Sequence, residues 1–596
     1  MKREDFLASA FARFVKDIPF VLYITFIQAI IAALWPESGI AFHFGKMLFL
    51  LALVKAFGLG VILSLLSFGK KWLQWLIVLI HICVLEIYVY LAIQFNVRVT
   101  TNVVALVLQT NPGETSEFFQ QFFPLSTILL LSAVFMCAIA IWGILIAFGK
   151  IIQTKARMVK QHAKIACLVA ICSLTIISLA INIVTDCNYL FNKRIKVINQ
   201  ILYDTTLPHQ DLMLSFTSIG SNSQKVKRIK QANDNIFIDS CNFDCSNVVL
   251  VIGESYIKSH ASIYGYRHQT TPFMEESQRD GNLFVFSDVV THSGGTSVCM
   301  QYFYSTKSIN DNRVWEDSPL LPAIFKKAGY SVTLLDNQST RYSGTSTLDY
   351  STSFFINPAE IHEQCFNYRN ENVYKYDLEM LNAEKHIITQ QKSKHTFTII
   401  HLFGQHFGAS GRYPNDKENT IFTTDSVRRR DISDSDMLQE IAHYDNATHY
   451  NDLVFKEICD LYSQKETVIL YVSDHGECVY DTSALTYGRP LCDSKSMETI
   501  KVIYEIPMMI WCSDLFKERH SEMVDKIKSS INRPFMNDDV CHILFDVAGI
   551  RGKFFDASRS VVNEDFVARD RIINGSFNYD VHKADISAIK LKSRGN

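Results

Sequence analysis

The stretch TVILYVSDHGE, from Thr467 to Glu477, decides the fold expected for the second half of the chain. It opens with six β-branched, aromatic or aliphatic residues, and an unbroken apolar run of this length is typical of a strand buried on both faces of a parallel sheet. Asp474 and His475 follow at once, and ligands in open α/β sheets bind beyond the carboxyl ends of strands. The stretch therefore predicts a buried strand that delivers a metal-binding pair. An Asp-His-Gly turn is also ordinary loop chemistry, so the pair needs support from elsewhere.

Three more apolar runs end in side chains of the same chemistry. They are NVVLVIGES (247–255), which ends in Glu254; SVTLLDNQ (331–338), which ends in Asp336, Asn337 and Gln338; and TFTIIHLFGQH (396–406), which ends in His401 and His406. Helical stretches separate the runs, and repeated strand and helix is the pattern of α/β architecture. We therefore expect a central, mostly parallel sheet with these side chains at one edge.

A candidate nucleophile lies between the first two of these strands, in THSGGTSVCMQYFYS (291–305). Ser293, Gly294 and Gly295 permit a tight turn, and the residues after Thr296 can form a helix. A hydroxyl at a helix amino terminus lies in positive potential, which favours an alkoxide and a nearby phosphoryl oxygen. A helix-capping Ser or Thr is the simpler alternative. Carboxylates and an imidazole around a hydroxyl suit zinc, and manganese is a second possibility.

The first part of the chain is expected to span a membrane. A helix needs roughly 20 apolar residues to cross a bilayer, and five runs approach that length: 18–35, 47–68, 72–95, 124–148 and 165–184. No clear small-residue cleavage site follows the first run, so it is interpreted as an uncleaved anchor. We expect a transmembrane domain over 1–190, a linker with bridging helices over 191–239, and a globular catalytic domain over 240–596.

Basic residues in the short loops predict the orientation. They gather at the amino terminus, between spans two and three, where Lys70 lies, and between spans four and five, where Lys160 lies. Basic loops stay in the cytoplasm, so an odd number of spans places the globular domain outside. Ten of the 14 cysteines lie in that external part, where disulfides are permitted. Cys241 could pair with Cys245, and Cys478 with Cys492.

The net charge of −2 gives no indication of a nucleic-acid partner. In the external loop after the third span, Glu114 follows an Asn-Pro-Gly break in LQTNPGETSEFF (108–119). The residue can favour a helix dipole, or it can meet a cationic lipid headgroup at the membrane surface. The two interpretations are equally supported by the residues alone.

The ordered set Gly253-Glu254-Ser255, Gly295-Thr296, Gly404-Gln405-His406 and Ser473 to Glu477, behind five spans, resembles the phosphoethanolamine transferases of Gram-negative envelopes. These enzymes belong to the alkaline-phosphatase and sulfatase superfamily. The resemblance covers nearly the whole chain and includes YGYRHQTTP (264–272) and YDNATHYND (444–452). It implies a sulfatase-like α/β fold for the globular domain, with the catalytic side in the periplasm of the bacterial inner membrane.

The resemblance also implies roles for individual residues. It gives Glu254, Thr296, Asp474 and His475 as ligands of a catalytic zinc, with Thr296 the nucleophile. His406 is implied to steady the phosphoryl group or the leaving oxygen. The side chains expected to contact substrate are Glu114, Asn337, His401, Glu477 and Tyr487.

Some positions depart from the lipid A-modifying members of that family. Those members carry a histidine where this chain has Tyr487, and a cysteine before the nucleophile where it has Gly294 or Gly295. ECVYDTSA (477–484) and AGIRGKFFDASRSVV (548–562) look more like members that modify the lipopolysaccharide core. The acceptor is therefore expected to be a core sugar or lipid A.

The reaction implied is a two-step transfer. Thr296 attacks the phosphorus of phosphatidylethanolamine, diacylglycerol leaves, and a glycan of lipopolysaccharide then takes phosphoethanolamine from the threonine. A phosphoglycerol transferase or a phosphodiesterase of the same superfamily is the alternative. A sulfatase needs a Cys or Ser that becomes formylglycine, which Thr296 cannot supply. A non-catalytic envelope sensor is disfavoured because every metal-ligand position holds a competent side chain.

Overall fold

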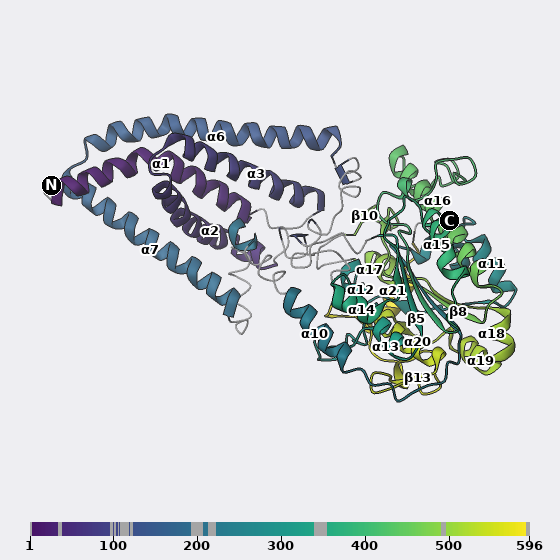
Figure 1. Cartoon of the computed structure of the whole chain (residues 1–596). Helices are drawn as coiled ribbons and strands as arrows, with labels where there is room; N and C mark the ends of the chain where they lie inside the picture. Colours follow the sequence, from purple (N-terminus) through teal and green to yellow (C-terminus); the bar gives the residue numbers. More distant parts are fainter. Residues whose placement is uncertain are drawn as a thin grey trace. The chain divides into compact units, whose positions relative to one another are not determined.

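The computed structural model (Figure 1) describes residues 3–33, 39–95, 99, 103–104, 107, 118–119, 123–191, 207–212, 222–338, 355–489 and 496–591. The chain divides into two compact units, Met1–Gly220 and Ser221–Asn596. Glu114 and Cys492 lie outside the described residues, so the expectations that involve them stay predictions.

The first unit is a group of long apolar helices. They are α1 (Arg3–Ala33), α2 (Gly39–Leu66), α3 (Lys71–Phe95), α6 (Leu125–Arg157) and α7 (Gln161–Phe191). All five are long and apolar enough to cross a membrane, as the sequence predicted. The helix α1 packs against α2 and α6, and its Phe20 and Tyr23 rings lie 6.3 and 5.3 Å from the indole of Trp142 in α6. Aromatic edge-to-face packing thus holds these helices together.

The second unit is built around a seven-stranded sheet. Its strands, in spatial order, are β3 (Leu283–Val285), β11 (Met508–Cys512), β8 (Thr467–Ser473), β2 (Asn247–Gly253), β7 (Thr396–His401), β5 (Ser331–Asp336) and β6 (Tyr368–Arg369). The strands from β8 to β6 are parallel, and β11 runs antiparallel to both of its neighbours. The expected mostly parallel sheet is therefore confirmed, and β11 makes it mixed.

Helices cover both faces of the sheet, as Figure 1 shows. In β2, Val248 and Leu250 point to one face and pack with α12 (Thr296–Phe303), α13 (Leu321–Lys327) and α20 (Val540–Ala548). Val249 and Val251 point to the other face and pack with α11 (Pro272–Arg279), α15 (Asp377–Thr389) and α16 (Ser435–Tyr462). Because the strands are buried on both sides, they lack polar alternation, which is why the apolar runs identified them.

Shorter elements complete this unit. They are helices α10 (Asn222–Asp234), α14 (Ala359–Cys365), α17 (Met497–Tyr504), α18 (Asp514–Arg519), α19 (Ser521–Ser530) and α21 (Tyr579–Ala588), and strands β1 (Ser240–Cys241), β4 (Val289–Val290), β9 (Cys478–Val479), β10 (Tyr487–Gly488), β12 (Phe535–Met536), β13 (Ile550–Arg551), β14 (Ile572–Ile573) and β15 (Phe577–Asn578).

One of the two disulfides that the cysteine spacing allows does not form. Cys241 and Cys245 are both thiols and do not pair. Cys241 is in β1, which pairs with β13, whereas Cys245 is buried and its thiol donates to the carbonyl of Asn247. The backbone pairing of β1 and the burial of Cys245 thus take precedence over the short separation in sequence.

Candidate active site

The strand ends meet at one edge of the sheet, as the sequence predicted. Gly253 of β2 is aligned with Ser473 of β8, and Ile252 of β2 with His401 of β7. The residues that follow Gly253 and Ser473 are Glu254 and Asp474, so the parallel register brings these carboxylates together. Glu254, Asp474 and His475 are buried, and one ligand atom from each lies within 4.8 Å of the others.

The loop after β8 is shaped to present Asp474 and His475. Oδ1 of Asp474 accepts hydrogen bonds from the backbone N–H groups of Ser255 (3.0 Å) and His475 (2.7 Å). Gly476 is required here because a Cβ would lie 2.1 Å from the carbonyl oxygen of Val502. Nδ1 of His475 lies 3.1 Å from the carbonyl oxygen of Gly476, a bond that leaves Nε2 directed into the cluster.

Glu254 is fixed by neighbours on both of its oxygens. Ser255 donates its hydroxyl to Oε1 (2.8 Å), and the amide of Gln338 donates to Oε2 (3.1 Å). Ser255 has a φ of +53°, which a residue other than glycine rarely adopts. Such backbone strain is concentrated at functional sites, and here it turns the chain sharply just after β2.

Thr296 is the first residue of α12, and its hydroxyl lies in the cluster. Oγ1 donates to Oε2 of Glu254 at 3.1 Å and lies 3.0 Å from Nε2 of His475. The N-cap residue Gly295 is extended (φ −128°, ψ 125°), so the helix begins at the threonine. The positive end of the helix dipole therefore faces the cluster.

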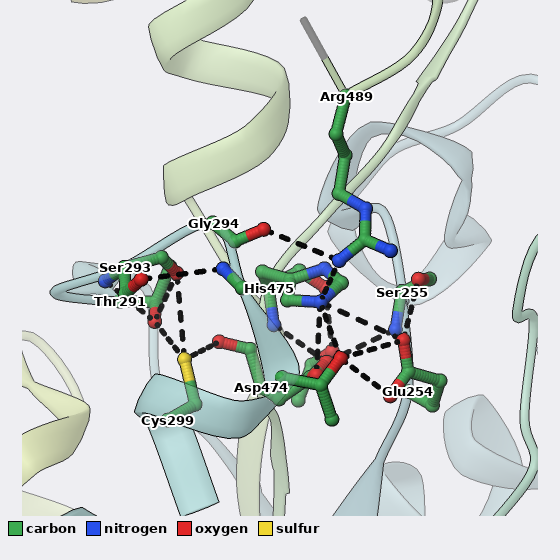
Figure 2. A network of polar contacts seen from close by, with 12 residues as sticks. Glu254, Ser255, Thr291, Ser293, Gly294, Cys299, Asp474, His475 and Arg489 are labelled. Carbon is green, nitrogen blue, oxygen red and sulfur yellow. Dashed lines mark hydrogen bonds and ion pairs between the residues drawn. The ribbon is translucent and has the colours of Figure 1, made fainter. Parts of the chain in front are cut away.

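A second network joins the turn before Thr296 to the loop of Asp474. Figure 2 shows Cys299 of α12 beside Thr291, with the sulfur 3.4 Å from the hydroxyl of Thr291 and 3.4 Å from the carbonyl oxygen of Asp474. The amide of Asn537 donates to the same two oxygens, at 2.9 and 3.3 Å. These contacts connect the turn that precedes Thr296 to the loop that carries Asp474 and His475.

The cluster has the properties of a metal site. Oδ2 of Asp474 is buried, and the described residues offer it no hydrogen-bond donor, although Nε2 of His475 lies 3.0 Å away. Burial raises the pKa of Asp474 and lowers the pKa of His475 to about 3, so the imidazole is neutral and can act as a ligand. Two carboxylates, a neutral imidazole and a hydroxyl fit a divalent cation.

His406 is held beside the cluster by a loop that packs on Glu254. The N–H of Gln405 donates to the carbonyl oxygen of Glu254 at 3.1 Å. Gly404 has a φ of +51°, and a Cβ there would lie 2.9 Å from that oxygen. Burial lowers the pKa of His406 to about 4, and its Nδ1 is buried without a hydrogen-bond partner among the described residues.

Two residues expected to bind substrate are engaged inside the protein. His401 pairs with Asp336 (Nδ1 to Oδ1, 3.0 Å), and both side chains are buried. Asn337 donates its amide to Asp377 (2.8 Å) and accepts from the N–H of Tyr374 (2.7 Å). Substrate contact by Asn337 would break these bonds, so its visible role is to hold Asp377, which caps the N–H groups at the start of the His406 loop.

Glu477 and Tyr487 face different groups. Burial raises the pKa of Glu477 to about 7, and the positive charge of Arg489 offsets part of that rise. The hydroxyl of Tyr487 donates to Glu440 of α16 (3.2 Å), and its ring stacks on Tyr480 with centroids 5.1 Å apart. The expected substrate contacts of both residues remain predictions.

The sequence did not indicate several residues of the site, and Arg489 is the most prominent of them. Figure 2 shows its guanidinium against His475 and Gly294. Nη1 lies 2.5 Å from Nε2 of His475 and 3.2 Å from the carbonyl oxygen of Gly294. Arg489 is 14 residues after His475, and only the β9–β10 hairpin returns it to the site. A Gly before an Arg was the available signal, and it is too common to be informative.

Comparison with known proteins gives the family and several similar enzymes. The family model described as Sulfatase matches residues 246–550. The chain is 25% identical over 488 residues to the phosphoethanolamine transferase EptC of Escherichia coli strain K12, with 80% of each chain covered. It is also 25% identical over 504 residues to CptA of Salmonella typhimurium. The Kdo(2)-lipid A phosphoethanolamine 7''-transferase of E. coli matches over less of its length, 46% of each chain.

Solved structures agree with this assignment. The C-terminal periplasmic domain of E. coli EptC, crystallised also as a complex with Zn, has 27% identity and a TM-score of 0.50 and covers 58% of this chain and 95% of that chain. The integral membrane protein EptA of Neisseria meningitidis has 17% identity and a TM-score of 0.57 over 93% of this chain and 98% of that chain, which shows a shared fold.

The expected resemblance to phosphoethanolamine transferases and the expected fold class, five apolar helices followed by a sulfatase-like domain, are therefore confirmed. Because the family model covers more than half of the chain and includes every residue of the cluster, the protein belongs to the sulfatase family.

Proposed function

We propose that the protein transfers phosphoethanolamine from phosphatidylethanolamine to a lipopolysaccharide acceptor, a core sugar or lipid A, through a covalent intermediate on Thr296. The observation that carries the proposal is the hydroxyl of Thr296, which lies 3.1 Å from Glu254 and 3.0 Å from His475 at a helix amino terminus. The similarity to EptC and CptA supports phosphoethanolamine as the transferred group. The enzyme would lie in the bacterial inner membrane with its catalytic unit in the periplasm.

Zinc is the cofactor proposed for the cluster, held by Glu254, Thr296, Asp474 and His475. The similar domain of E. coli EptC has been crystallised with Zn, which supports this choice of metal. When bound, the metal would lower the pKa of the Thr296 hydroxyl and neutralise charge on the phosphoryl group.

In the first step, Thr296 would attack the donor lipid and diacylglycerol would leave. The hydroxyl of Thr296 gives its proton towards Glu254, to which it already donates, and its oxygen attacks the phosphorus. A bond forms between Oγ1 and phosphorus, and the bond from phosphorus to the oxygen of diacylglycerol breaks. The departing oxygen takes up a proton. The amino terminus of α12 stabilises the negative charge that develops on the phosphoryl oxygens.

In the second step, an oxygen of the acceptor would replace the oxygen of Thr296 on phosphorus. A hydroxyl or phosphate of the glycan attacks phosphorus, loses its proton if it has one, and releases Thr296, which regains its own. His406 would steady the phosphoryl group or the leaving oxygen, since its imidazole is neutral at physiological pH and its Nδ1 is unpartnered among the described residues. Glu114, Glu477 and Tyr487 remain the residues proposed to contact the two substrates.

The test is a transfer assay with the full-length protein in vesicles. Zinc-loaded protein is supplied with lipopolysaccharide and either phosphatidylethanolamine or phosphatidylglycerol, and the acceptor is analysed by mass spectrometry. We expect phosphoethanolamine on the acceptor, a loss of about a thousandfold or more in Thr296→Ala, and partial activity in Thr296→Ser, because the hydroxyl is the nucleophile. Transfer of phosphoglycerol alone, or full activity in Thr296→Ala, would contradict the proposal.

A further inference from the structure

Arg489 connects the two halves of the candidate active site. Its Nη1 donates to Nε2 of His475 at 2.5 Å and to the carbonyl oxygen of Gly294 at 3.2 Å (Figure 2). His475 belongs to the proposed metal ligands, and Gly294 lies in the turn before Thr296. A single guanidinium therefore faces both the metal ligands and the nucleophile.

The backbone of the β9–β10 hairpin fixes this placement. The two strands are antiparallel, with Tyr487 opposite Val479 and Gly488 opposite Cys478. Extending this register by one residue sets Arg489 opposite Glu477. Glu477 is the last residue of the loop that carries Asp474 and His475. Gly488 has a φ of +76°, a conformation that favours glycine and turns the chain towards the site.

The contact with His475 is incompatible with a bound metal. Nε2 of His475 is the atom that zinc would take, and one lone pair cannot accept a hydrogen bond and bind a cation together. Arg489 has to leave Nε2 when the metal is held, and a guanidinium does not lose its charge. Its charge already acts on the buried carboxyl of Glu477, and beside a divalent cation the guanidinium can bind a further anion through the donors that its present contacts leave unused.

A phosphoryl group on Thr296 would supply that anion. The hydrogen bonds that the structure gives to Arg489 within the described residues both use Nη1, so Nε and Nη2 can donate to two oxygens of one group. Arginine binds phosphate in this forked geometry, and hydrogen bonds between charged groups are about twice as strong as neutral ones.

We infer that Arg489 binds the non-bridging oxygens of the transferred phosphoryl group, both in the donor lipid and in the adduct on Thr296. This inference rests on the proposed function and adds a phosphoryl-binding residue to it. It also changes the expectation for this hairpin, because the cation that faces the site is Arg489, while the hydroxyl of Tyr487 donates to Glu440.

Titration with inorganic phosphate tests the inference in the zinc-loaded, full-length protein. We compare the parent with Arg489→Ala and Arg489→Lys, and with Arg428→Ala as the control, because Arg428 is an exposed arginine paired with Asp425 on the surface. Losing the contact should weaken phosphate binding by about 10- to 100-fold in Arg489→Ala. Arg489→Lys should recover part of the affinity, since it keeps the charge without the fork, and Arg428→Ala should match the parent.

Zinc content, measured on the same samples, separates phosphate binding from a structural role. Arg489→Ala should hold as much zinc as the parent, because the arginine competes for Nε2 of His475. Unchanged phosphate affinity in Arg489→Ala, or loss of zinc from it, would overturn the inference. A parent that binds phosphate through Arg489 but transfers nothing from phosphatidylethanolamine would instead contradict the proposed function.

Discussion

At the scale of single residues, the site depends on glycines that allow backbone segments to approach one another. Gly404 lies against Glu254, where a Cβ would be 2.9 Å from the carbonyl oxygen and 3.0 Å from the amide nitrogen. Both neighbours are backbone atoms and cannot rotate away. Gly476 is similar, since its Cβ would meet the backbone of Val502. The proposed metal ligands are therefore positioned by main-chain contacts.

We predict that Gly404→Ala reduces zinc binding as well as stability. The positive φ of +51° and the clash with Glu254 should lower the free energy of unfolding by about 1–3 kcal/mol and displace a proposed ligand. Gly575→Ala is the matched control, because Gly575 has a φ of +71° but nothing within 4 Å of its Cβ. Zinc content after dialysis should fall only in Gly404→Ala. Equal zinc in the two variants would show that Gly404 does not position Glu254.

The site residues that were predicted from the sequence are positioned by strand pairing, whereas those that were missed are positioned by hydrogen bonds in loops. Glu254, Asp474 and His475 follow buried strands directly, so an apolar run and parallel pairing suffice to bring them together. Asn537 and Arg489 were missed, and they reach the cluster through hydrogen bonds to the carbonyl of Asp474 and to the imidazole of His475. Such contacts depend on loop geometry, which has no periodic signal in a sequence.

At the scale of elements, a buried histidine anchors the hairpin that carries Arg489. His260 donates to Asp445 of α16 (2.7 Å) and to Asp481 in the turn between β9 and β10 (2.9 Å). The other oxygen of Asp481 accepts from the N–H of Val479 in β9 (3.1 Å). All three charged side chains are buried. Helix α16 is thus connected to the hairpin through one imidazolium.

The pKa of His260 predicts a pH dependence of stability. Burial alone would lower this pKa, but the charges of Asp481 and Asp445 outweigh burial and raise it from 6.5 to about 10. A raised pKa in the folded protein stabilises fully below the unfolded value and less as the pH rises through the folded value. The contribution of His260 should therefore be complete below pH 6.5, still nearly complete at pH 6.5, and mostly lost at pH 10.

We expect His260→Gln to lower the free energy of unfolding by about 3–5 kcal/mol at pH 6.5, because two buried carboxylates lose their cation. Calorimetry of the full-length protein in detergent should show the difference in Tm from the parent shrinking between pH 6.5 and 10. His386→Gln on α15 is the control, since His386 is exposed and contacts the carbonyl of Ala383. A difference in Tm that does not change with pH would contradict the ion triad.

The short strands of the β9–β10 hairpin could not be predicted from the sequence. Long buried strands such as β2 and β8 were predicted because each is an unbroken apolar run of several residues, which is unusual in a loop. Strands β9 and β10 have two residues each, too few for a pattern, and their pairing is set by tertiary contacts. The possible pairing of Cys241 with Cys245 does not occur, since closeness in sequence does not establish disulfide geometry.

At the scale of the whole molecule, the chain combines a unit of apolar helices with a sheet-based unit. Five apolar helices suit a bilayer, and the sheet-based unit carries the cluster that could hold a metal ion. The proposed donor, phosphatidylethanolamine, diffuses only within a bilayer, and we propose that this is why one chain carries both units. Hydropathy sufficed to predict the five apolar helices, because it is summed over many residues and tolerates local errors. The orientation inferred from the basic loops stays a prediction.

The most direct test of the account is to identify the residue that carries phosphoethanolamine during the reaction. Zinc-loaded, full-length protein is incubated in vesicles of phosphatidylethanolamine without acceptor, quenched in acid, digested and mapped by mass spectrometry. The account predicts a phosphoethanolamine adduct on Thr296 that disappears when lipopolysaccharide is added and is absent from Thr296→Ala. An adduct on Ser255 or Ser297, or full transfer to lipopolysaccharide with no adduct on the protein, would contradict it.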